Sequence, residues 1–110
     1  MELETLPGGQ LALRVLPHMA EDRYSPSGNR LLASVGRAVR SRAIGVVLTG
    51  MGDDGTEGAR AILAAGGRVV AESAETAVIN GMPGSAVRAG VVTQTLPLTQ
   101  IAAYLDELVR

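Results

Sequence analysis

A short loop of glycines and aspartates contains the residues whose types and spacing point most directly to chemistry. Residues 50–55 read Gly-Met-Gly-Asp-Asp-Gly and satisfy the pattern G-x-G-x-x-G. Glycines at this spacing allow a tight turn and a close backbone approach, and a helix that begins after them offers free N–H groups to an anion. The loop therefore allows a dinucleotide or another anion to bind through Gly50, Gly52 and Gly55. Glu72 lies about where such a site keeps the acid that binds the ribose.

Two carboxylates on the same turn argue against this interpretation. Asp53 and Asp54 would stand where the pyrophosphate sits, and like charges a few Å apart cost roughly 1 to 4 kcal/mol each. A simpler hypothesis is that Asp54 and Glu57 form a D-x-x-E capping box for the following helix, although this leaves Asp53 and the glycines unexplained. A divalent metal on Asp53, Asp54 and Glu57 is also conceivable, but the spacing is not that of a calcium loop.

Few other side chains in the sequence could act in catalysis. There is no cysteine, which excludes thiolate chemistry, and the single histidine, His18, excludes a multi-histidine metal centre within one chain. None of the serines stands in a G-x-S-x-G elbow. Ser25 and Ser27 are instead typical of a loop or of a helix N-cap.

Composition excludes several classes of partner. The chain has 110 residues, of which 46% are apolar, enough for one compact domain or a part of one. Ten basic and eleven acidic residues give a net charge of -1, so no basic field attracts nucleic acid or anionic lipid. No apolar stretch approaches 18 residues and the acidic start lacks the basic region of a signal peptide, so we expect no membrane insertion and a cytoplasmic location.

Three regions must position the loop. Residues 1–16 contain two alternating runs joined by Pro7-Gly8-Gly9, which predicts a β-hairpin. Residues 17–29 contain Pro17, Pro26 and Gly28 without periodicity and are expected to form a loop. Residues 30–110 are expected to form an α/β core.

Helices and strands alternate through that core. We predict helices over residues 28–42, 55–65, 85–89 and 98–109, a turn at 81–84, and strands over residues 44–49, 68–71 and 91–96. The strand at 44–49 is a nearly continuous β-branched run, which is typical of the middle of a parallel sheet. The predicted fold class is therefore α/β: a three-layer αβα arrangement with a mainly parallel sheet, incomplete, preceded by an N-terminal β-hairpin.

Three motifs carry a resemblance to a known family. Residues 46–55 read VVLTGMGDDG, residues 64–67 read AAGG and residues 80–83 read NGMP. Together they resemble the C-terminal half of the catalytic domain of bacterial chemotaxis protein-glutamate methylesterases, the CheB-type enzymes. Pro26-Ser27 and the hairpin of residues 1–15 resemble the same family, so the resemblance extends over nearly the whole chain.

The resemblance implies an ester hydrolase that removes methyl groups from glutamate methyl esters on chemoreceptor helices by a Ser/His/Asp triad, without a cofactor. The triad aspartate falls on Asp54, whose expected role is to accept the imidazole N–H and to stabilise the imidazolium. The resemblance also places the loops of Met51 and of Met82 and Pro83 near the rim of the substrate site. Turn chemistry and packing are the alternative explanation for these three residues.

The family motifs that supply the triad serine and histidine are not found in these 110 residues. His18 does not match the family's catalytic histidine. A lone triad aspartate cannot perform acyl transfer, because its role is to orient a base. We therefore expect the isolated chain to be inactive and to need a partner, either the missing Ser- and His-bearing segment or a regulatory domain. The alternative is a dinucleotide- or anion-binding module.

Overall fold

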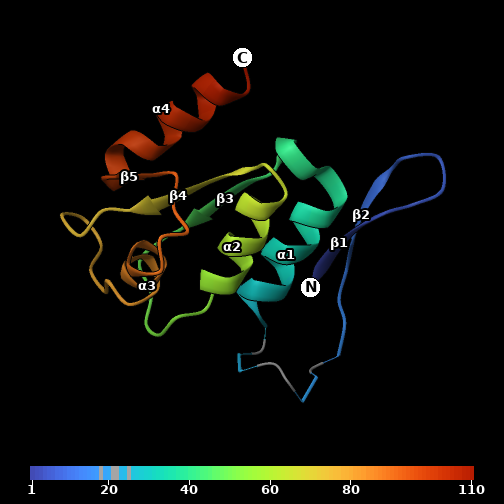
Figure 1. Cartoon of the computed structure of the whole chain (residues 1–110), viewed down its shortest axis with the longest axis horizontal. Coiled ribbons are helices and arrows are strands. Elements are labelled where there is room, and N and C mark those ends of the chain that lie inside the picture. The colour runs from blue at the N-terminus through green and yellow to red at the C-terminus, as the bar shows by residue number, and fades with distance from the viewer. Residues whose placement is uncertain (18, 21–22, 25) are drawn as a thin grey trace.

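The computed structural model describes residues 1–17, 19–20, 23–24 and 26–110. It is an α/β structure with a small antiparallel hairpin beside a parallel sheet (Figure 1). Among the described residues, no helix has both the length and the apolar character needed to cross a membrane.

The N-terminal hairpin is confirmed. Strands β1 (Glu2–Thr5) and β2 (Leu11–Arg14) pair antiparallel, with Leu3 opposite Leu13. The hairpin packs on helix α1 (Gly28–Val39), where the backbone N–H of Leu3 donates to the Oγ of buried Ser34 at 2.8 Å. This bond fixes the hairpin to the helix that opens beside the glycine loop.

The main sheet consists of three parallel strands in the order β3-β4-β5. Strand β3 covers Ile44–Val47, β4 covers Arg68–Glu72 and β5 covers Gln94–Leu96. The expectation that the 44–49 run lies mid-sheet is wrong for this sheet, since β4 is its central strand. The residues of β4 from Val69 to Glu72 are buried, whereas alternate residues of β3 are only partly covered.

Helices cover both faces of the sheet, as predicted. Helices α2 (Thr56–Ala64) and α3 (Met82–Arg88) contact β3 and β4 on one side, and α4 (Leu98–Leu108) lies on the other side over β4 and β5 (Figure 1). The core between the sheet and the first helices is aliphatic. Its buried residues are Ala43, Val47, Ala59, Ile62, Val69, Ala86 and Val91.

The three largest differences from the predicted element boundaries concern the first helix, the start of α3 and the last strand. The first helix ends at Val39 and continues as the 3-10 turn η1 (Arg40–Arg42), where Arg40 has a φ of 54°. The predicted turn at 81–84 is wrong, because α3 already begins at Met82; Pro83 lies in its first turn, where a missing N–H costs nothing. The last strand begins at Gln94 and not at residue 91. The N–H of Val91 instead donates to the carbonyl of Ala86 in α3.

Helices α1 and α2 pack closely at Gly58. A Cβ added there would lie 2.7 Å from the Cβ of Leu32 and 3.0 Å from the Cα and the carbonyl oxygen of Asn29. These atoms belong to or adjoin the backbone, so they cannot rotate away. The absence of a side chain at Gly58 is therefore what lets the N-terminal ends of the two helices meet.

We predict that Gly58→Ala destabilises the fold by about 1–2 kcal/mol, because the strain of overpacking exceeds the gain in helix propensity. Urea denaturation measures the change. Gly36→Ala is the matched control in α1, since its Cβ would approach no atom closer than 3.3 Å. Equal or greater loss in the control would contradict the assignment of the close contact to Gly58.

Candidate functional site

The glycine loop runs from the carboxyl end of β3 to the start of α2. Gly50 is anchored on the segment before α3, because its N–H donates to the carbonyl of Ile79 at 2.9 Å and its carbonyl accepts from the N–H of Met82 at 2.8 Å. Gly52 and Gly55 have φ values of 87° and 99°, which L side chains rarely adopt. These left-handed turns set the direction in which the two aspartates between them point.

Asp54 points to the N-terminus of α1. Its Oδ2 accepts the backbone N–H of Gly28 at 2.7 Å and its Oδ1 accepts that of Asn29 at 3.0 Å. A carboxylate at this place satisfies free N–H groups of the helix and interacts favourably with its positive end. The carboxylate is thus fixed by two bonds to a different helix from the one it precedes.

Asn29, in the first turn of α1, binds the start of α2. Its Oδ1 accepts the backbone N–H of Gly55 and that of Gly58, both at 2.9 Å. The start of α1 is therefore capped by Asp54, from the loop that leads into α2, and the start of α2 is capped by Asn29 of α1. Sequence analysis missed Asn29, because a cap supplied from 26 residues away has no local pattern.

The predicted capping box is therefore wrong. The N-cap of α2 is Gly55, which has no side chain to cap with, and Glu57 pairs with Arg60 along the helix at 3.2 Å. The left-handed residues on both sides of the aspartates turn Asp54 away from its own helix. Ser27, in contrast, is confirmed as an N-cap: its Oγ accepts the N–H of Arg30 at 3.3 Å.

Asp53 points the other way, toward the segment before α1. Its Oδ1 accepts the hydroxyl of Tyr24 at 3.0 Å, and its Oδ2 pairs with the guanidinium of Arg23 at 2.9 Å. The Tyr24 bond is the largest of the effects that hold the pKa of Asp53 below its ordinary value, and the charge of Arg23 adds to it. The adjacent aspartates thus have different roles. Asp53 binds the loop to residues 23–24, and Asp54 caps α1.

Glu72 makes structural hydrogen bonds and is not free to bind the ribose of a dinucleotide. It is only 3% exposed, its Oε1 accepts the N–H of Thr49 at 2.9 Å and its Oε2 accepts the hydroxyl of Thr76 at 2.8 Å. Both oxygens are engaged by the protein. With Asp53 and Asp54 also on the loop, the arrangement disfavours a dinucleotide at Gly50, Gly52 and Gly55.

Met51 is the exposed member of the expected rim. Its side chain is 81% exposed at the tip of the loop. Met82 lies against Gly50, where any Cβ would collide with its Sδ, and Pro83 is fully buried in α3. The three residues are therefore near one another along the loop and the start of α3, but only Met51 projects into solvent.

Comparison with known proteins places this loop in a family. The CheB methylesterase family model matches residues 1–105. The chain belongs to the CheB methylesterase family. The match includes the glycine loop and both of the helices that meet at Asp54.

The sequences of related proteins align with nearly the whole chain. A "protein-glutamate methylesterase/protein-glutamine glutaminase 1" of Myxococcus xanthus is 47% identical over 94% of this chain, and one of Rhizobium meliloti is 44% identical over 93%. The chain spans only 30% and 29% of these two proteins. The solved CheB methylesterase catalytic domain of Thermotoga maritima matches with a TM-score of 0.84 at 35% identity, over 97% of this chain and 56% of that domain.

The structure brings no further catalytic candidate among the described residues to Asp54 in this CheB-type fold. His18 and Ser25 lie outside the described residues. Among the described residues, no three His, Cys, Asp or Glu side chains are grouped to hold a metal ion, and Asp53, Asp54 and Glu57 point to separate partners.

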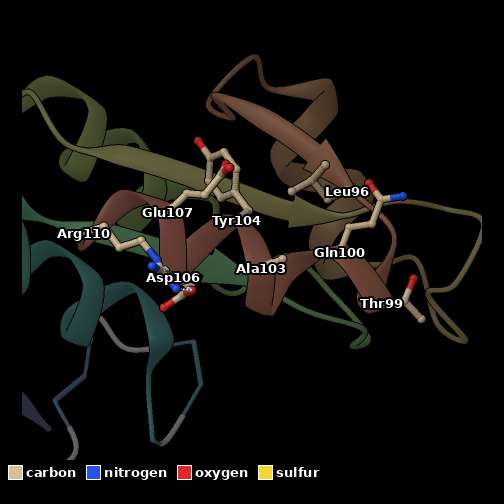
Figure 2. A pocket seen from close by; sticks show the side chains of 8 residues that line it. All are labelled: Leu96, Thr99, Gln100, Ala103, Tyr104, Asp106, Glu107 and Arg110. Atoms are coloured by element: carbon tan, nitrogen blue, oxygen red, sulfur yellow. Dashed lines mark hydrogen bonds and ion pairs between the residues drawn. The ribbon is translucent and has the colours of Figure 1, made fainter.

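A groove of about 680 Å³ on the described part of the chain contains no residue of the glycine loop. It runs between β5 and α4, from Leu96 and Thr99 to Arg110, and Arg110 pairs with Asp106 at its far end (Figure 2). The size of a cavity therefore does not locate the family's chemistry here.

We predict that Tyr24→Phe raises the pKa of Asp53 toward its ordinary value, because the strongest hydrogen bond to the ionised form is lost. Arg23→Gln raises it as well. NMR titration of the Asp53 carboxyl carbon measures both. Since the lowered pKa stabilises the fold above the carboxyl's unfolded pKa and this stability is lost as pH falls, both variants should show a weaker acid dependence of stability. An unchanged Asp53 pKa in Tyr24→Phe would contradict the assignment.

Proposed function

We propose that this chain supplies the triad acid of a protein-glutamate methylesterase, and that the acid is Asp54. The supporting observation is the pair of bonds from Gly28 and Asn29, which hold the carboxylate at a fixed place on the carboxyl edge of the sheet. Family membership and the names of the relatives support the activity. Asp53 is a poorer candidate, since Tyr24 and Arg23 draw its carboxylate to the outside of the loop.

The geometry leaves Asp54 able to take a further donor. An ionised carboxylate has about four lone-pair sites, and two of these are used by α1. In the proposed triad a histidine Nδ1–H donates to a remaining site, so that the imidazole keeps the tautomer whose Nε2 removes the proton of the attacking serine. The serine and the histidine are supplied by sequence outside residues 1–110.

The proposed substrate is a glutamate methyl ester on a chemoreceptor helix. Attack by the serine gives an acyl-enzyme with loss of methanol, and water then releases the free glutamate. Met51, exposed at the loop tip, would contact the receptor helix, while Met82 and Pro83 would hold Gly50 in place from below. Chemoreceptor tails and this enzyme would meet in the cytoplasm.

The sheet offers a place for the complementing segment. The outer edge of β3 is unpaired among the described residues, and apolar Leu48 and Ile79 beside it are nearly half exposed. Free strand edges next to exposed apolar side chains favour pairing with further chain. We propose that the segment with the serine and histidine pairs there, with a regulatory domain as an additional partner.

We predict that Asp54→Asn in the complete gene product lowers the kcat of methyl-ester hydrolysis by about 10⁴-fold, because the histidine loses its orienting carboxylate. Release of radiolabelled methanol from methylated receptor membranes measures the rate. Asp53→Asn is the matched control, since it removes the same charge from the adjacent residue, and it should keep most of the activity. Equal losses in the two variants, or none in Asp54→Asn, would contradict the proposed role.

A further inference from the structure

A further cavity includes Asn80, the residue that bridges Gly50. It has a volume of about 300 Å³ and opens between the carboxyl ends of β4 and β5 and the helix α3. The residues that line it are Glu72, Ser73, Ala74, Asn80, Gly84, Val87, Arg88 and Thr95. None of them carries a role in the proposed triad.

Two nitrogen donors converge inside this cavity. A Cβ built on Gly84 would lie 3.0 Å from the Nδ2 of Asn80 and 3.2 Å from the Nη1 of Arg88. The missing side chain therefore leaves a space that both donors border. Arg88 makes no hydrogen bond or ion pair with any described residue, so its guanidinium stands over that space without a counter-charge.

One lining residue also has a buried hydroxyl. The Oγ of Ser73 is the buried side-chain polar atom that finds no hydrogen-bond partner among the described residues. Such an atom loses its hydration without compensation unless a ligand or water bonds to it. The cavity is thus bordered by one unpaired cation and one amide, with the unsatisfied hydroxyl of Ser73 buried in its wall.

The acid that lines the cavity does not cancel the cation. Both oxygens of Glu72 are held by Thr49 and Thr76, on the side of β4 that faces α4. A planar guanidinium beside an amide donor matches the two oxygens of a carboxylate. The set of donors therefore fits one carboxylate better than a neutral group.

Asn80 connects this cavity with the glycine loop. Asn80 pairs with Gly50 in a parallel bridge, and the adjoining bonds from Ile79 and Met82 fix that segment to the loop. The backbone that carries Asn80 is therefore attached directly to the loop that carries Asp54.

We propose that the cavity bordered by Ser73, Asn80, Gly84 and Arg88 is a subsite for a free carboxylate on the substrate helix, close to the glutamate ester. This rests on the proposed function. The ligand class is an acidic side chain, and its effect is to orient and select receptor segments that carry an unmodified acid near the ester.

The test is an NMR titration of the protein with blocked glutamate, N-acetylglutamate N-methylamide, followed at the Arg88 Nε–H and the Asn80 side-chain amide. We expect saturable shifts with blocked glutamate and none with blocked glutamine. Arg88→Gln should weaken binding by about tenfold, as expected for loss of one charge-assisted contact. Gly84→Ala, which fills the space while favouring the helix, should weaken it as well. Arg42→Gln is the control, since it removes a distant exposed positive charge from η1.

Each outcome decides the proposal. Saturable binding that Arg88→Gln weakens and Arg42→Gln does not would support it. Equal binding of blocked glutamine, tighter binding of inorganic phosphate, or no saturable shift would overturn it. Asp54→Asn should leave the titration unchanged, so loss of esterase activity in that variant tests the proposed function separately.

Discussion

The mutual capping of α1 and α2 is the interaction on which the rest of the site depends. Asp54 binds two N–H groups of α1, and Asn29 of α1 binds two N–H groups around the start of α2. Neither cap forms unless the helices approach closely, and Gly58 allows that approach. The hairpin then packs on α1 through Ser34, and Gly50 is fastened to the start of α3. The position of the proposed catalytic carboxylate therefore depends on the packing of α1 against α2 and the hairpin, and on the attachment of Gly50 to the start of α3.

One loop separates two carboxylates that are neighbours in sequence. Left-handed Gly52 and Gly55 turn Asp54 toward α1, while Asp53 reaches Tyr24 and Arg23. The same loop carries exposed Met51 at its tip and borders the cavity of Arg88 through Asn80. A small segment thus combines the proposed acid with the proposed contact surface and lies next to the proposed subsite.

Sequence predicted the elements better than it predicted their contacts. Periodicity gave the hairpin, the main helices and a parallel sheet with helices on both faces, since these depend on local patterns. The motifs at residues 46–55, 64–67 and 80–83 indicated the CheB methylesterase family, and the resemblance pointed to Asp54 as the triad acid. The cap from Asn29 and the early start of α3 were missed. The cap depends on residues distant in sequence, and Pro83 is equally compatible with a turn and with a first helical turn.

The most direct test of the account is the kcat of the complete gene product carrying Asn29→Ala, compared with Ser27→Ala. Both substitutions remove a side-chain acceptor at the start of α1, and each should destabilise the fold by about 1 kcal/mol. Only Asn29 holds the segment that follows Asp54. The account predicts that Asn29→Ala lowers kcat at least tenfold with little change in KM, while Ser27→Ala leaves it nearly unchanged. Equal kcat values in the two variants would show that mutual capping does not position the acid.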